Sequence, residues 1–139
     1  MIRFSLTGVA LLVCLAVVVA LTTLPLSVNI IRVIRQIVVI QGHPNANDAL
    51  GHAFLYGTLM AVGYWALRRG LRFTPAFCGA LATALLLGAL TELSQQFTPG
   101  RTMTLSDLLA NWLGAMSVAA LIGYRRSARN AGHGARGNG

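Results

Sequence analysis

The chain has 139 residues, of which 55% are hydrophobic and only 10% are charged. So few charges cannot cover a soluble surface, and the length leaves no room for several domains, so the composition favours one small integral membrane unit. The net charge of +8 comes entirely from arginines that punctuate apolar runs, a pattern that argues against nucleic-acid binding, which needs basic residues interleaved with polar and aromatic ones.

Four segments are long enough to cross a bilayer as helices, which takes about 20 mostly apolar residues. They run from Phe4 to about Leu24, from about Ala46 to Leu67, from about Thr74 to Gln95 and from about Thr104 to Tyr124. Lipid offers no partners to the backbone, so we expect an all-α membrane protein with four transmembrane helices in a single domain, residues 1–124. A signal peptide is the alternative for the first segment, but its uncharged run exceeds the about 7 to 15 residues of a signal core.

Two segments of the chain lie outside the predicted spans. Between the first two helices, SVNIIRVIRQIVVIQGHPNAN repeats isoleucine and valine near helical spacing around Arg32, Arg35 and Gln36. This pattern predicts a short amphipathic helix in the membrane interface, although the β-branched content also permits a strand. Residues 125–139 are rich in glycine and arginine and nearly free of apolar side chains, which predicts a disordered basic cytoplasmic tail near anionic headgroups.

The arginines predict which way the helices run. Eight of them fall on one side of the four-helix arrangement, and only Arg32, Arg35 and Arg101 fall on the other. By the positive-inside rule the side with eight arginines is cytoplasmic, so we expect both termini to be cytoplasmic. The acidic residues Asp48, Glu92 and Asp107 all fall on the outer side.

Polar residues at helical spacing mark the outer ends of the last three predicted helices. Asp48, His52 and Tyr56 are each four residues apart, Asp107 and Asn111 repeat that spacing, and Glu92 and Gln95 are three apart. Side chains at these spacings share one helix face. Because charges are costly in lipid, we expect these faces to meet one another or a wet cavity, with Arg101 near enough to pair with a carboxylate.

Helix capping is an alternative explanation for the two aspartates, because Asn45-x-x-Asp48 and Thr104-x-x-Asp107 both resemble capping boxes. Capping does not explain Glu92, which lies near the carboxyl end of its helix, where the helix dipole repels an anion. Glu92 therefore needs Arg101, a protonated His52 or its own proton, and such a group is a functional candidate by default. An ion pair that merely fastens two helices together remains an alternative.

We predict no cofactor and no metal. Asp48, His52, Glu92 and Asp107 supply ligand types, but they form no ligand-spaced motif. The two cysteines, Cys14 and Cys78, lie in long apolar runs and are interpreted as small core residues. Small residues along 79–89 permit close packing within the chain or between copies, which leaves a homo-oligomer open.

The series NDALGHAFLYGTL and TELSQQFTPGRTMTLSDLLANWLGA resembles the VanZ-like family of small bacterial membrane proteins. The resemblance covers roughly residues 47 to 115 and is carried by Asp48, His52, Tyr56, Glu92, Gln95, the turn at 97–101, Asp107, Asn111 and Gly114. The family often has a lysine where this chain has Ala49. The resemblance implies a multi-pass protein of the bacterial inner or plasma membrane with a role at the cell envelope. There the protein would alter how a glycopeptide or a lipid-linked wall precursor interacts with the outer leaflet.

Three functions remain open at this point. The first is binding of a membrane lipid headgroup or a lipid-linked cell-wall precursor, through Asp48, His52, Tyr56, Glu92, Gln95, Arg101, Asp107 and Asn111. The second is a membrane hydrolase or transferase in which Asp48 orients His52 as general base and Glu92 acts as acid, with Asp107 as a further catalytic candidate, although no convincing nucleophile is present. The third is a proton-coupled carrier.

Overall fold

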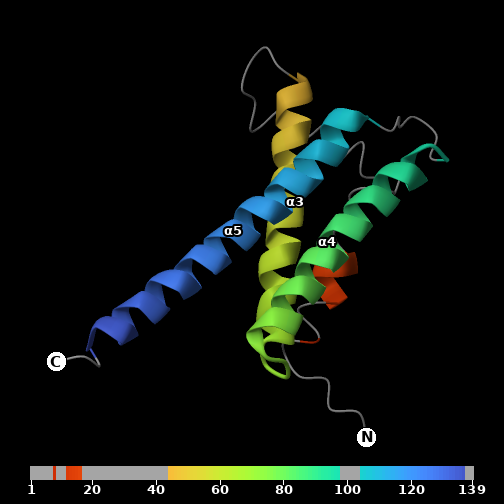
Figure 1. The fold of residues 1–139 in the computed structure, drawn as a ribbon. Coiled ribbons are helices and arrows are strands. Elements are labelled where there is room, and N and C mark those ends of the chain that lie inside the picture. Colours follow the sequence, from red (N-terminus) through yellow and green to blue (C-terminus); the bar gives the residue numbers. More distant parts are fainter. Residues whose placement is uncertain (1–7, 9–11, 17–43, 98–103, 137–139) are drawn as a thin grey trace, which may run out of the picture.

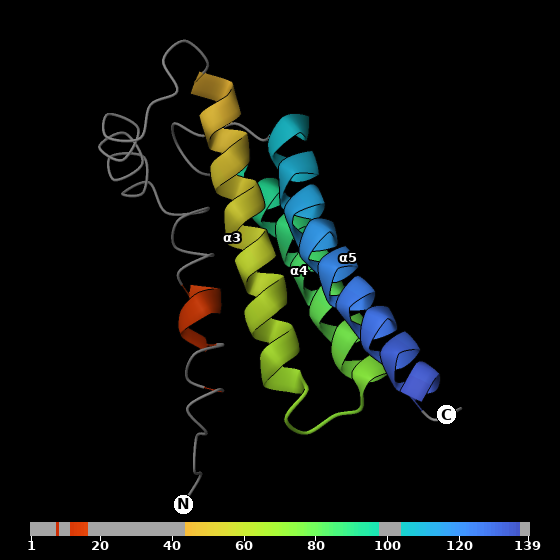
Figure 2. The same cartoon turned by 90° about the vertical axis from the view of Figure 1, so that its left-hand side faces the viewer.

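The computed structural model describes residue 8 and residues 12–16, 44–97 and 104–136. Within these ranges residues 12–16 are helical, and three long helices follow: α3 (Pro44–Leu67), α4 (Phe73–Gln95) and α5 (Leu105–Arg136). Figures 1 and 2 show α4 running antiparallel to α3 beside it, and α5 running in the same sense as α3 and packing against both. The all-α fold class is therefore confirmed for the described part of the chain.

The second and third predicted helices are confirmed as α3 and α4, whose ends lie within two residues of the predicted ends. Helix α3 begins at Pro44, a residue that suits the first helical position because its missing N–H has no partner there anyway. This start places Asp48 beyond the first turn of the helix. The capping alternative for Asn45 and Asp48 is therefore wrong.

The fourth predicted helix is confirmed as α5, but it is longer than predicted. A disordered tail was expected from residue 125, and this is wrong for residues 125–136, which continue the helix to Arg136. Arginine and alanine are good helix formers, and the guanidinium of Arg126 stacks 3.8 Å from the ring centre of Phe73 on α4. At the other end of α5, Thr104 Oγ1 accepts a hydrogen bond of 3.2 Å from the Asp107 N–H, so the predicted capping role of Thr104 is confirmed.

The helices bury small and polar side chains and expose large apolar ones. The buried residues of α4 follow a four-residue repeat, which comprises Ala76, Ala80, Ala84, Gly88 and Glu92. On the opposite face Leu86 and Leu90 are 64% and 58% exposed. A soluble helix has the reverse arrangement, because water drives its large apolar side chains inwards.

Glycine allows α3 and α5 to approach closely. A Cβ atom on Gly114 would overlap the backbone carbonyl oxygen of Ala53, and one on Gly57 would lie 3.2 Å from the carbonyl oxygen of Gly114. Small residues at a helix crossing permit this kind of backbone contact. The contact brings the N-terminal halves of the two helices together, and His52 and Asn111 lie there.

Two of the described helices are long and apolar enough to cross a membrane: α4, and α5 over Leu105–Gly132. Helix α3, with Asp48 and His52 in its first half, does not reach the same hydropathy. Most of the first predicted helix lies outside the described residues, as do Arg101 and the interfacial segment up to residue 43. Residues 12–16 contribute Cys14 and Leu15 to the packing around the core of α3, α4 and α5.

Candidate functional site

Six polar side chains converge where the N-terminal halves of α3 and α5 meet the C-terminal end of α4. We refer to them as the Glu92 cluster: His52, Tyr56, Thr91, Glu92, Gln95 and Asn111. Five of them are buried, Tyr56, Glu92 and Asn111 completely, and the side chain of His52 is only 14% exposed. Polar groups at this depth need partners, because an unpaired one costs free energy wherever water is excluded.

The Asn111 amide connects α5 to both other helices. Its Nδ2 donates to the carbonyl oxygen of Gly88 at 3.4 Å and to Glu92 Oε1 at 3.3 Å. These two acceptors orient the amide, so that Oδ1 faces His52 Nδ1 at 2.9 Å. An oxygen acceptor here requires the proton of the imidazole to be on Nδ1, which leaves Nε2 as the basic nitrogen of the neutral ring.

Glu92 is the acidic residue of the cluster. Its Oε1 lies 3.7 Å from His52 Nδ1 and accepts a hydrogen bond of 3.4 Å from Gln95 Nε2. Its other oxygen, Oε2, is buried and makes no hydrogen bond of normal geometry with the described residues, although the backbone N–H of Thr104 lies near the carboxyl group. The carboxylate of Asp107 is also close enough to repel that of Glu92. Glu92 Oε2 is therefore set to accept a hydrogen bond from a donor, preferably a cationic one.

Tyr56 and Thr91 form the edge of the cluster that lies nearest the middle of the helices. Their hydroxyl groups hydrogen-bond to each other, and Tyr56 also donates to the Leu87 carbonyl at 3.4 Å. Thr91 Oγ1 contacts the Gly88 carbonyl at 3.2 Å. The sequence analysis missed Thr91, although it shares the α4 face of Gly88 and Gln95, from which it is three and four residues away.

Five of the eight predicted ligand-binding residues belong to the cluster: His52, Tyr56, Glu92, Gln95 and Asn111. Asp48 is half-buried one turn before His52 on α3, and Asp107 is half-buried one turn before Asn111 on α5. The group that orients His52 at Nδ1 is Asn111, whereas the hypothesis gave the orienting role to Asp48. Arg101 lies outside the described residues, so its predicted pairing with a carboxylate stays a prediction.

Within the described ranges, no three histidine, cysteine, aspartate or glutamate side chains are grouped closely enough to hold a metal ion. The interpretation of Cys78 as a core residue is wrong, because its side chain is exposed on α4. Cys14 packs against the apolar core as interpreted.

No protein-family model, no curated protein and no solved structure matches this chain. The resemblance to the VanZ-like family therefore rests on the sequence motifs alone.

Proposed function

We propose that the chain is a VanZ-like integral membrane protein of the bacterial cell envelope, in which the Glu92 cluster binds a lipid headgroup or a lipid-linked wall precursor and modulates glycopeptide susceptibility. The observation that carries the proposal is the complete burial of Glu92, held by side chains from two further helices and with Oε2 making no hydrogen bond of normal geometry with the described residues. Buried ionisable groups of this kind are expensive in a membrane and mark sites of function.

The surface of the helices supports a membrane location. In the most apolar stretch of α4 only 22% of the residues are buried, and in that of α5 only 28%. The core helix of a soluble protein would bury most of such a stretch. Four spans with both termini in the cytoplasm remain our proposed topology, since it places most of the arginines inside. Helix α3 then crosses the membrane with its polar side chains turned towards α4 and α5.

Arg101 completes the proposed site. It precedes Thr104, the residue that caps the start of α5, by three positions in the sequence. A guanidinium near Glu92 and Asp107 offsets the repulsion between the two carboxylates. Its remaining N–H donors stay available to bind a phosphate. In this arrangement the carboxylates orient the arginine, and the ligand's phosphate is bound by the arginine.

Titration of a lipid-linked wall precursor into the purified protein in nanodiscs tests this proposal. We expect Arg101→Lys and Glu92→Gln to weaken binding about tenfold or more, because the first replaces the paired donors of the guanidinium with a single ammonium and the second removes the negative charge that orients Arg101. Thr83→Val is the matched control, since Thr83 also lies on α4 but its hydroxyl donates to the Gly79 carbonyl of its own helix, away from the Glu92 cluster. Wild-type affinity in both site variants would contradict the proposal.

Susceptibility is tested separately in cells. Expression of the wild-type chain in a teicoplanin-susceptible host is expected to change the inhibitory concentration of the drug, and expression of Glu92→Gln at an equal membrane level is expected not to. If the wild-type chain leaves the inhibitory concentration unchanged, the part of the proposal that concerns glycopeptides is wrong, whatever the binding result.

A second candidate function is a membrane-embedded hydrolase or transferase, and the specific observation in its favour is the contact of 2.9 Å between His52 Nδ1 and Asn111 Oδ1. With the Nδ1 proton directed at Asn111, Nε2 is the nitrogen that can take a proton from a substrate or a water molecule. Incubation of the protein with labelled lipid-linked precursors should then yield a product that is lost in His52→Gln. Absence of turnover with every precursor would remove this candidate and leave the binding proposal intact.

A further inference from the structure

A cavity lies at the opposite end of the helices from the Glu92 cluster. It has a volume of about 550 Å³, which is within the about 300 to 1,000 Å³ typical of ligand sites. It is formed where α5 diverges from α3 and α4 towards its C-terminal end (Figure 1). Five arginines line it, and we refer to it as the arginine pocket: Arg68, Arg72, Arg125, Arg126 and Arg129.

The arginine pocket concentrates positive charge without an acidic side chain in its lining. Arg125 and Arg129 are four residues apart on one face of α5, where like charges repel each other. The acidic residues of the chain all lie at the other end of the helices, in or beside the first turns of α3 and α5 and the last turn of α4. The positive-inside rule explains why arginines occupy this end but not why they surround one cavity.

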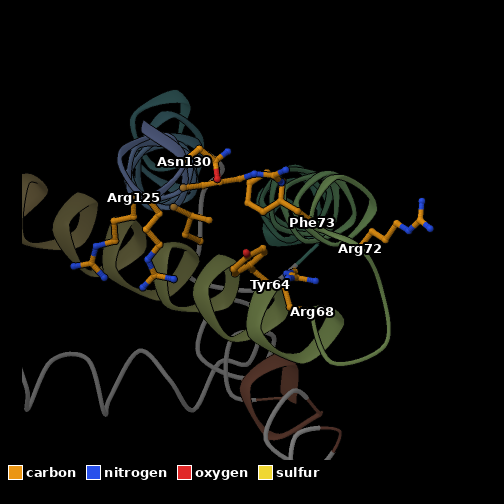
Figure 3. A pocket seen from close by; sticks show the side chains of 9 residues that line it. Tyr64, Arg68, Arg72, Phe73, Arg125 and Asn130 are labelled. Atoms are coloured by element: carbon orange, nitrogen blue, oxygen red, sulfur yellow. The ribbon is translucent and has the colours of Figure 1, made fainter. Parts of the chain in front are cut away.

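Two of these guanidinium groups are already held in place. Arg126 stacks over the ring of Phe73, which in turn stacks on Phe77 with ring centres 5.4 Å apart. Arg68 Nη1 donates a hydrogen bond of 2.7 Å to the Leu71 carbonyl. Arginines fixed in this way lose less conformational freedom when they bind a ligand. In Figure 3, Arg72 extends away from the other side chains, so it lies at the rim.

The remaining lining is partly apolar. Tyr64 and Phe73 meet edge to face with ring centres 5.8 Å apart, and Ile122 of α5 adds an aliphatic side chain. Figure 3 shows Tyr64 of α3 between Arg125 of α5 and Arg68, which follows α3. A ligand that fits this lining carries negative charge for the guanidinium groups and a carbon skeleton for the aromatic rings.

We propose that the arginine pocket binds a phosphate-bearing anion of at least two negative charges. Each guanidinium group can donate two parallel hydrogen bonds to two oxygens of one phosphate. Several guanidinium groups around one cavity can therefore bind two phosphate groups, or one phosphomonoester with two negative charges. Two sources supply this chemistry: the headgroup of an anionic lipid, or a soluble phosphorylated compound. The site is independent of the Glu92 cluster and of the function proposed for it.

Two binding measurements on the full-length protein distinguish the sources. In the first, inorganic pyrophosphate is titrated into the protein in phosphatidylcholine nanodiscs. In the second, native mass spectrometry counts bound phosphatidic acid after reconstitution in nanodiscs that contain it. Saturable pyrophosphate binding alone assigns a soluble ligand, retained phosphatidic acid alone assigns a lipid headgroup, and both together assign a site for either.

The chain offers a closely matched pair of variants. Arg126→Gln removes one charge and one arginine–aromatic contact inside the arginine pocket. Arg69→Gln also removes one charge and one arginine–aromatic contact, but outside the pocket, because Arg69 stacks 4.2 Å from the ring centre of Trp65. We expect Arg126→Gln to weaken binding about tenfold or more and Arg69→Gln to change it less than about twofold. Arg129→Gln replaces Arg126→Gln if circular dichroism shows that the latter is misfolded. Absence of binding in both measurements, or an equal loss in the pocket variant and Arg69→Gln, would overturn the proposal.

Discussion

Asn111 is the residue on which the geometry of the Glu92 cluster depends, because its amide contacts both His52 and Glu92. Asn111→Leu removes these contacts and leaves both partners buried with fewer hydrogen bonds. We expect a loss of about 1 to 3 kcal/mol in the free energy of unfolding, the usual cost of unsatisfied buried polar groups. Thermal unfolding in detergent measures it. Asn130→Leu, at an exposed position of α5, is the control and should change stability little; equal losses in the two variants would show that Asn111 has no special role.

At the scale of single residues, the sequence predicted which residues belong to the Glu92 cluster better than it predicted which of them contact each other. His52, Glu92 and Asn111 stand out because polar residues are rare in this chain and recur at helical spacing. Which of them touch depends on how α3, α4 and α5 are rotated about their axes, and sequence spacing does not fix that rotation. Asp48 was therefore assigned the orienting role that Asn111 performs at Nδ1, and Thr91 was overlooked as an ordinary hydroxyl.

At the scale of helices, the crossing of α3 and α5 depends on Gly114. A methyl group there would overlap the Ala53 backbone, which cannot rotate away. We expect Gly114→Ala to force the helices apart and to lower the free energy of unfolding by about 1 to 3 kcal/mol. Gly51→Ala is the matched control on α3, because nothing lies within 4 Å of its added methyl. That variant should be neutral or more stable by roughly 0.5 to 1 kcal/mol, and similar behaviour of the two variants would contradict a close crossing.

The continuation of α5 beyond residue 124 gives a separate prediction. Ser127→Pro removes a backbone donor and should break the helix there, at a cost of about 3 kcal/mol or more for an interior position. Hydrogen exchange should then become fast in the last turns of α5 while the amides around Asn111 stay protected. Ser127→Ala is the control and should leave both regions unchanged. Fast exchange beyond residue 124 in the wild-type protein would instead favour the disordered tail.

The helix ends show what a sequence can predict at this scale. Helices α3 and α4 were placed closely because long apolar runs give way to prolines, glycines and arginines at their ends. The end of α5 was misplaced because the absence of apolar side chains after Tyr124 was interpreted as disorder. Composition does not show that Arg126 reaches the ring of Phe73, a residue distant in the sequence, nor that alanines and arginines sustain the helix.

Over the whole molecule, the two polar sites lie at opposite ends of the same helices. Tyr64, beside the arginine pocket, comes twelve residues after His52 on α3, a separation of about 18 Å at a rise of 1.5 Å per residue. The apolar surface of α4 and α5 lies between the two ends. In the proposed topology this surface faces lipid, the Glu92 cluster faces the outer leaflet, and the arginine pocket faces the cytoplasm, whose leaflet carries the anionic lipids.

The proposed topology makes Phe97, after α4, accessible from outside and Arg69, after α3, accessible only from the cytoplasm. Both side chains are exposed, Phe97 by 82%, so cysteines at these positions can react. In a background of Cys14→Ala and Cys78→Ala, we expect a membrane-impermeant maleimide to label Phe97→Cys in intact cells and Arg69→Cys only after permeabilisation. The reverse pattern would invert the orientation and turn the Glu92 cluster towards the cytoplasm. Labelling of both variants in intact cells would mean that α4 does not cross the membrane, since its two ends would share one side.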